Sequence, residues 1–195
     1  MPEYNPNRHH RRSIRLKGYD YTLAGAYFVT ICIYHWDCLL GDVRDGEMVL
    51  SEYGRIVQHT WDDLPNHYPH VELDAWIIMP NHVHGIIVLT DVGAGHVGAG
   101  HVGAGLRPAP TTGKSPRRHD LPEIVRAFKS FSAYRINRLR NSPGIPVWQR
   151  NYYEHIIRTE RVLQAIRQYI SDNPIRWHLD RYNPEAMGHD LRATM

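Results

Sequence analysis

Two strand-like runs, residues 71–79 and 82–89, follow each other with only Pro80 and Asn81 between them. Both runs are rich in apolar, β-branched and aromatic side chains, as strands are. A connection this short joins neighbouring antiparallel strands, because parallel strands need a crossover of a dozen or more residues. The sequence therefore predicts a tight β-hairpin, and the rest of the fold must be built around it.

The segments before this hairpin alternate between strand and helix patterns. Residues 27–33 are β-branched and aromatic, as in a central strand. A second hairpin is predicted around the turn pair Asp45-Gly46. From Ser51, a residue type that caps helices, apolar residues recur at helical spacing as far as Pro65. One strand, one small hairpin and one helix are expected here.

An exact repeat follows the central hairpin. Val-Gly-Ala-Gly-His occurs at 92–96 and again at 97–101. A repeat this short and Gly-rich cannot bury a core, so we interpret residues 91–118 as a flexible insertion. We interpret the repeated His96 and His101 as residues without a function of their own, rather than as metal ligands.

The remaining segments are predicted to be mostly helical. Asp120 opens a helix over 121–140 with a capping-box pattern. Residues 145–149 form a short strand candidate, which its proline confines to a sheet edge. Two further helices are predicted over 152–158 and over 160–172.

The resulting order contains a βαββαβ kernel. It predicts an α+β, ferredoxin-like sandwich, in which helices pack on one face of an antiparallel sheet. We expect a basic N-terminal arm over 1–20, one domain over 21–176 that carries the insertion 91–118, and a C-terminal tail over 177–195.

Composition limits the class of protein. No run approaches the roughly 18 apolar residues of a transmembrane helix, and the basic N-terminus lacks the apolar stretch of a secretory signal. Cys32 and Cys38 do not have the spacing of a metal or redox motif. A cytoplasmic protein with no membrane partner is expected.

His82 and His84 lie one residue apart in a predicted strand. Alternate side chains of a strand share a face, so both imidazoles point the same way. Two nitrogen ligands on one rigid face form half of a site for a divalent metal. Alone, the pair is better explained as two half-exposed strand histidines, so the motif by itself is a weak indication of a metal site.

Tyr152 and His155 lie three residues apart in a predicted helix and share one of its faces, whereas Tyr153 points elsewhere. A tyrosine beside a third metal ligand can attack a phosphodiester. The alternative is that both tyrosines pack where the helix meets the sheet.

The basic residues gather in the N-terminal arm and on the predicted helix 121–140. Such charges suit the phosphates of single-stranded nucleic acid, although they also fit a solvated face. The candidate DNA-binding residues are Arg11, Arg12, Arg15, Lys17, Arg126 and Lys129.

Taken together and in order, several segments resemble the HUH single-tyrosine transposases, specifically the REP-associated tyrosine transposases of the IS200-like type. The two most specific are IMPNHVHGII at 78–87 and VWQRNYYEHIIR at 147–158. The other matching segments are residues 15–20, 27–30, 128–130, 169–170 and 173–174. Only the Gly-rich insertion and the tails have no counterpart.

This resemblance implies a ferredoxin-like fold and a Mg²⁺ or Mn²⁺ ion on His82 and His84. It implies a helix-borne tyrosine that nicks single-stranded DNA, forms a 5′-phosphotyrosine and frees a 3′-OH, so that the strand can be rejoined. By position the nucleophile is Tyr152, with Tyr153 as the fallback because the two are adjacent.

At the position of the expected third metal ligand, the sequence departs from the family pattern. Related transposases often use Gln four residues after the tyrosine, but here that position holds Ile156, which cannot bind a metal. We therefore assign the third ligand to His155, one residue earlier.

The resemblance also implies the partners: hairpins of single-stranded DNA beside a tetranucleotide, with no small-molecule cofactor, bound by a monomer or homodimer. Three alternatives remain open from the residues. They are a hairpin-binding protein that has lost cutting, a metal-dependent phosphodiesterase that uses water, and a structural metal protein.

Overall fold

The computed structural model describes residue 16, residues 18–91 and residues 119–186. Within them, no helix combines the length and the apolar character needed to cross a membrane. The elements, in chain order, are β1 (Gly25–Cys32), η1 (Tyr34–Trp36), β2 (Gly41–Arg44), β3 (Glu47–Leu50), α1 (Glu52–Asp62), α2 (Leu64–His67), β4 (Val71–Met79), β5 (His82–Leu89), α3 (Leu121–Leu139), β6 (Tyr153–Ile157), α4 (Glu160–Asp172) and η2 (Trp177–Leu179).

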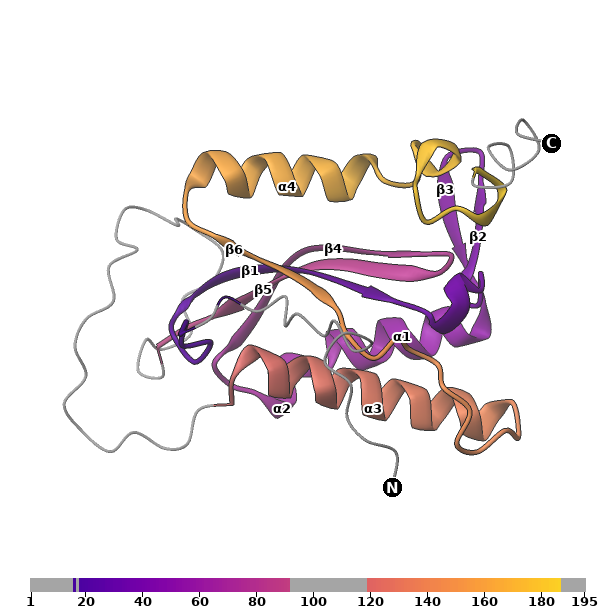
Figure 1. The fold of residues 1–195 in the computed structure, drawn as a ribbon, viewed down its shortest axis with the longest axis horizontal. Coiled ribbons are helices and arrows are strands. Elements are labelled where there is room, and N and C mark those ends of the chain that lie inside the picture. Colours follow the sequence, from indigo (N-terminus) through magenta and orange to yellow (C-terminus); the bar gives the residue numbers. More distant parts are fainter. Residues whose placement is uncertain (1–15, 17, 92–118, 187–195) are drawn as a thin grey trace, which may run out of the picture.

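Four strands form one antiparallel sheet in the order β4-β5-β1-β6. With α1 between β1 and β4, and α3 between β5 and β6, this is the expected ferredoxin-like arrangement. The predicted fold class is therefore confirmed. The β2–β3 hairpin stands apart as a separate two-stranded sheet (Figure 1).

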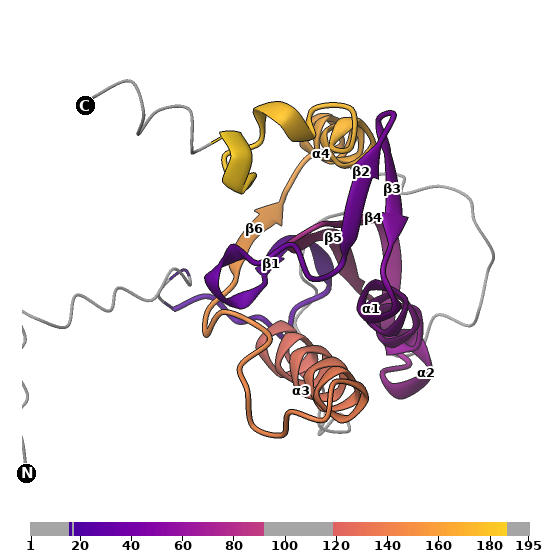
Figure 2. The same cartoon turned by 90° about the vertical axis from the view of Figure 1, so that its right-hand side faces the viewer.

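The sheet is covered on both faces. Helices α1, α2 and α3 lie on one face, as expected, and α4 with the following C-terminal segment lies on the other (Figures 1 and 2). Each face has its own apolar cluster. Trp61 and Phe128 belong to the larger one, whereas Phe28, Leu163 and Ile170 belong to the one beneath α4. Side chains of β5 are therefore buried on both faces of the sheet, except for the partly buried Val88.

The predicted helix starts are confirmed by their caps. The Ser51 hydroxyl accepts a hydrogen bond from the Gly54 N–H, and an Asp120 carboxylate oxygen accepts one from the Glu123 N–H. These bonds satisfy donors that the first turn of a helix leaves without partners. At the β2–β3 turn, Asp45 has a φ of 52° and the glycine after it a φ of 78°, as the predicted hairpin turn requires.

Two predictions from the sequence are wrong. Residues 152–158 are not a helix, because 153–157 form the edge strand β6, paired with β1. Residues 145–149 do not form a strand and contribute only an isolated bridge from Trp148 to Ile33. A short run of tyrosine and isoleucine has a higher preference for strand than for helix, and the free edge of β1 supplies its partner.

Candidate active site

The two histidines of β5 face α4 and are enclosed. His82 is 0% exposed and His84 is 1% exposed. Their Nε2 atoms lie 3.0 Å apart, so the two imidazoles converge on one point. Strand alternation produces this geometry, because Val83 between them points into the apolar cluster on the other face.

Hydrogen bonds on the far side of each ring fix its orientation. The side-chain nitrogen of Asn81 donates to the carbonyl oxygens of Trp36 and Tyr182, so its oxygen accepts from His82 Nδ1 at 2.9 Å. The Thr30 hydroxyl lies 2.9 Å from His84 Nδ1. Because each Nδ1 atom already has a hydrogen-bond partner, the two converging Nε2 atoms are the ones placed to bind a metal, as in other metal-binding histidines.

Burial also keeps both rings neutral. It lowers the pKa of His84 to about 3, with a smaller contribution from the positive charge of Arg181. Burial likewise holds the pKa of His82 well below its usual value, and His84 and Arg181 add to this effect. A neutral imidazole is the form that binds a metal, so the pair is ready for one at neutral pH.

Helix α4 brings a tyrosine to this pair. The Tyr169 hydroxyl lies 3.1 Å from His84 Nε2, and its ring lies against Phe28. Burial raises the pKa of Tyr169, although a hydrogen bond from Asn173 opposes the shift. Asn173 lies one helical turn after Tyr169 and is 4% exposed, and its side-chain oxygen has no hydrogen-bond partner among the described residues.

A third side chain approaches from the segment after α4. One carboxylate oxygen of Asp180 lies 4.0 Å from His82 Nε2. Within the described residues, His82, His84 and Asp180 form a group whose ligand atoms all lie within 4.8 Å of one another. Burial raises the pKa of Asp180, which is the expected cost of holding a carboxylate here without a cation.

The comparisons with known proteins agree with this fold. No protein-family model matches the chain. An uncharacterized protein of Haemophilus influenzae is 40% identical over 179 residues, which are 92% of this chain and 96% of that protein. A protein of the same organism named as a REP-associated tyrosine transposase is 27% identical over 158 residues, 80% of this chain and 74% of that one.

Among solved structures, a REP-associated tyrosine transposase bound to a REP hairpin has a TM-score of 0.52 and 19% identity, covering 90% of this chain and 74% of that one. The chain is therefore similar to REP-associated tyrosine transposases in sequence and in fold. The similarity inferred from the sequence segments is confirmed, whereas the role of each residue has to be argued from the geometry.

The structure does not bring Tyr152 to the histidines. Tyr152 directly precedes β6, and it lies on the α3 side of the sheet, where it lines a pocket with residues of α3. Tyr153 is opposite Thr30 on the histidine side, where its half-exposed ring meets Phe28. The helical face that made Tyr152 the first candidate does not exist.

His155 is also separated from the pair. It is opposite Phe28 on β1, and β1 lies between β6 and β5. Two strand spacings are about 9.5 Å, whereas bonds from imidazole to a metal are about 2 Å long. His155 is not in the group formed by His82, His84 and Asp180.

The candidate DNA-binding residues have different surroundings. The four in the N-terminal arm, Arg11, Arg12, Arg15 and Lys17, lie outside the described residues, as does the Gly-rich repeat. Arg126 is exposed on α3. Lys129 is half-buried, and burial lowers its pKa to about 8.

Tyr169 and Asn173 are residues near the histidine pair that the sequence reasoning did not assign to the site. The spacing of four residues between them was the sequence signal that could have indicated them. The family pattern places a side-chain amide four residues after the tyrosine, and the pair Tyr169 and Asn173 satisfies it where Tyr152 and Ile156 do not.

Proposed function

We propose that this protein nicks and rejoins single-stranded DNA at palindromic repeat hairpins, and that Tyr169 is the nucleophile. The observation that carries the proposal is the 3.1 Å separation of the Tyr169 hydroxyl from His84 Nε2, beside the converging Nε2 atom of His82. The relative bound to a REP hairpin supports the choice of substrate. Tyr169 replaces Tyr152 and its fallback Tyr153 in this role.

The ion of this site is proposed to be Mg²⁺ or Mn²⁺, held by His82, His84 and a side-chain oxygen. Two neutral imidazoles with an oxygen donor suit Mn²⁺ well and can accept Mg²⁺. The unpartnered buried oxygen of Asn173 favours it as the third ligand, and Asp180 is the second candidate. A divalent ion there supplies positive charge that neutralises the phosphate and favours the phenolate.

The reaction exchanges one phosphodiester bond for another. The Tyr169 oxygen forms a bond to the scissile phosphorus, and the bond from phosphorus to the 3′ oxygen breaks. The phenol loses its proton and the departing 3′ oxygen gains one. A 5′-phosphotyrosine keeps the energy of the broken bond, so the reverse attack by a 3′-OH rejoins the strand without ATP.

The enclosed histidines impose a condition on this reaction. A scissile phosphate has to approach an imidazole pair that is at most 1% exposed. The covering groups come from the segment after α4, where the Tyr182 ring lies 5.1 Å and the Trp177 ring 6.1 Å from the His82 ring. Cutting therefore requires the segment 177–183 to move away from His82.

The other partners follow from the substrate. The arm residues Arg11, Arg12, Arg15 and Lys17 and the exposed Arg126 are proposed to contact DNA phosphates. The protein is expected to act on the nucleoid in the cytoplasm, as a monomer or homodimer.

A denaturing gel with a labelled hairpin and Mn²⁺ tests the proposal. Wild type should retain label covalently, and Tyr169→Phe should abolish both the adduct and the nick. Tyr152→Phe and Tyr153→Phe are matched controls that keep the ring and should still cut. Hairpin binding without any adduct would favour a binding protein, and nicking by Tyr169→Phe would favour a hydrolase that uses water.

A further inference from the structure

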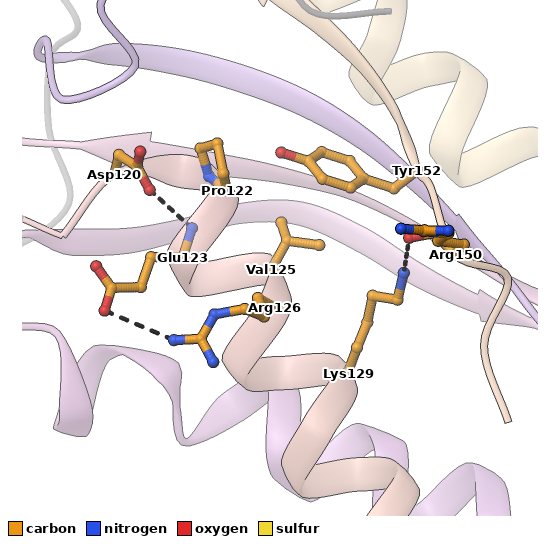
Figure 3. Close-up of a pocket in the computed structure, with 8 residues that line it drawn as sticks. All are labelled: Asp120, Pro122, Glu123, Val125, Arg126, Lys129, Arg150 and Tyr152. Atoms are coloured by element: carbon orange, nitrogen blue, oxygen red, sulfur yellow. Dashed lines mark hydrogen bonds and ion pairs between the residues drawn. The ribbon is translucent and has the colours of Figure 1, made fainter. Parts of the chain in front are cut away.

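A second concave site lies on the opposite face of the sheet from the histidines. It has a volume of about 480 Å³, which is within the range of small-ligand sites. Figure 3 shows it between the first turns of α3 and the segment that leads into β6. Its lining residues are Asp120, Pro122, Glu123, Val125, Arg126, Lys129, Arg150 and Tyr152.

This pocket combines a flat ring, apolar side chains and cations. The Tyr152 ring extends across it toward the start of α3, where Pro122 and Val125 lie (Figure 3). Arg126 and Arg150 are exposed at its rim. An aromatic ring with guanidinium groups beside it is the combination that binds an unpaired nucleotide, because the ring stacks on the base and the cations contact the phosphates.

The pocket wall is held in place by a half-buried cation. Lys129 Nζ donates to the carbonyl oxygens of Gln149 at 2.6 Å and Arg150 at 3.0 Å, and lies 3.5 Å from that of Asn151. It thereby ties α3 to the backbone that carries Tyr152. Lys129 was a candidate for phosphate contact. Its ammonium group is already in contact with three carbonyl oxygens, so we assign it a structural role in the pocket wall instead.

The acidic residues of the pocket are also engaged. An Asp120 oxygen caps α3 by accepting from the Glu123 N–H at 2.8 Å. The two Glu123 oxygens lie 2.9 Å from His119 Nδ1 and 3.7 Å from Arg126. These contacts partly offset the negative charge at the α3 end, so a phosphate is better accommodated at the Arg150 end.

The edge strand β6 links this pocket to the catalytic face. Tyr152 lies on the pocket side and the next residue, Tyr153, on the histidine side, where it is 48% exposed. No strand in the described chain pairs with the outer edge of β6. A single DNA strand can therefore pass over this edge from one face to the other within a short distance.

We propose that this pocket binds one unpaired nucleotide of the DNA strand that flanks the hairpin. The base stacks on Tyr152 against Pro122 and Val125, and the phosphates contact Arg126 and Arg150. The inference rests on the proposed function only in taking single-stranded DNA as the ligand. It gives this family member a second contact that holds the flanking strand while the scissile phosphate lies on the other face.

Fluorescence anisotropy separates this site from catalysis. The probes are a labelled 12-nucleotide oligo-dT and a labelled blunt hairpin, with chelator present, in the Tyr169→Phe protein so that cutting plays no part. Adding Tyr152→Ala should weaken oligo-dT binding by about 5- to 100-fold, the range measured for one stacked base. Blunt-hairpin binding should change by less than about twofold, because it lacks the flanking single strand that the pocket is proposed to bind.

Three further variants control for folding and charge. Tyr152→Phe keeps the stacking surface and should bind oligo-dT as the parent does. Tyr134→Ala removes a ring that is 65% exposed on the same helix but lies outside the pocket, and should have no effect. Arg126→Gln should reduce the slope of log affinity against log salt by about 0.7, the value for one phosphate of a single strand.

Equal oligo-dT binding by Tyr152→Ala and its parent, with both folded by circular dichroism, would overturn the proposal. Equal losses for oligo-dT and blunt hairpin would overturn it too, because the pocket would then not distinguish unpaired DNA. Since metal and Tyr169 are absent from the assay, neither result depends on whether Tyr169 is the nucleophile.

Discussion

Neutral His82 and His84 make the stability of the fold depend on pH. The pKa of His84 is about 3 in the fold, and that of His82 is also lowered, against about 6.5 in an unfolded chain. The unfolded state therefore binds protons that the folded state excludes once the pH falls below about 6.5. The free energy of unfolding therefore has its full value above that pH. It decreases progressively as the pH falls below it toward the pKa values of the folded state.

We expect the unfolding free energy of the metal-free protein to fall by about 1.2 kcal/mol through His84 as the pH drops from 6 to 5, with a further decrease in the same direction through His82. Urea denaturation at pH 7.5, 6 and 5 with chelator measures this. His84→Gln removes one of the two groups and should make the dependence shallower. A flat profile between pH 7 and 5 would mean that the histidines are accessible to protons in the folded state.

The third ligand can be identified by the affinity for Mn²⁺. Asn173→Ala removes the unpartnered buried oxygen and should weaken binding by about 10- to 100-fold, whereas Asp180→Asn, which keeps an oxygen, should have less effect. Titration followed by the electron paramagnetic resonance of free Mn²⁺ gives the affinities.

Asn173→Asp preserves an oxygen ligand and should retain binding, and Asp172→Asn is a matched control at the end of α4. A larger loss in Asp180→Asn than in Asn173→Ala would reverse the assignment.

At the scale of elements, α4 is fixed to the sheet by one ion pair. Arg167 Nε donates to Asp74 at 2.8 Å, and Asp74 lies at an irregularity in β4 where the register with β5 shifts. Hydrogen bonding to Arg167 is the main cause that holds the pKa of Asp74 below its usual value. Tyr169 lies two residues further along α4, so this pair positions the tyrosine against His84.

Breaking this pair should slow cutting as well as loosen the helix. We expect Asp74→Ala and Arg167→Ala each to lower the single-turnover nicking rate, and the double variant to be little worse than either. The coupling energy for stability should be about 1 kcal/mol, because both side chains are partly exposed. Arg161→Ala on the exposed surface of α4 is the control, and strictly additive effects would show that the pair does not act as a unit.

The sequence predicted the elements wherever the local pattern was long and capped. Ser51 and Asp120 located two helix starts correctly, and the run from His82 to Leu89 located the strand that carries the two candidate metal ligands. The prediction of a helix at 152–158 failed because a segment this short carries too little periodicity to separate strand from helix. Because of that one error, Tyr152 was expected on the side of the histidines, whereas it lies on the α3 side of the sheet.

The site was only partly predictable for a different reason. His82 and His84 share a face through strand alternation, which is local and can be read from the sequence. The contact of Tyr169 with His84 joins residues 85 positions apart, and it depends on which face of the sheet α4 covers. No local pattern carries that information, although the amide at Asn173 was a visible clue.

At the scale of the whole molecule, the segment after α4 closes the histidine site. The Tyr182 ring is stacked on Trp36, with ring centres 4.5 Å apart and an angle of 11° between the planes. The Tyr182 carbonyl accepts from Asn81, the residue that also orients His82. Trp36 itself has a φ of 63°, a strained conformation for a residue other than glycine.

Releasing this segment should therefore favour DNA entry. Tyr182→Ala removes the stacked ring and is expected to raise the single-turnover nicking rate several-fold at subsaturating DNA. Leu179→Ala, at a side chain that is 73% exposed in the same segment, should leave the rate unchanged. A lower rate in Tyr182→Ala would mean that the closed segment helps to build the site instead of blocking it.

The central claim, that Tyr169 attacks the DNA, is tested most directly by locating the covalent adduct. Wild-type protein is trapped with a hairpin and Mn²⁺, and then digested with trypsin and nuclease for mass spectrometry. Cleavage after Arg150, Arg158, Arg167 and Arg176 separates the candidates, since Tyr152 and Tyr153 fall in 151–158 and Tyr169 falls in 168–176. A nucleotide on Tyr169 in peptide 168–176 is the predicted result, and a nucleotide on peptide 151–158 would contradict it.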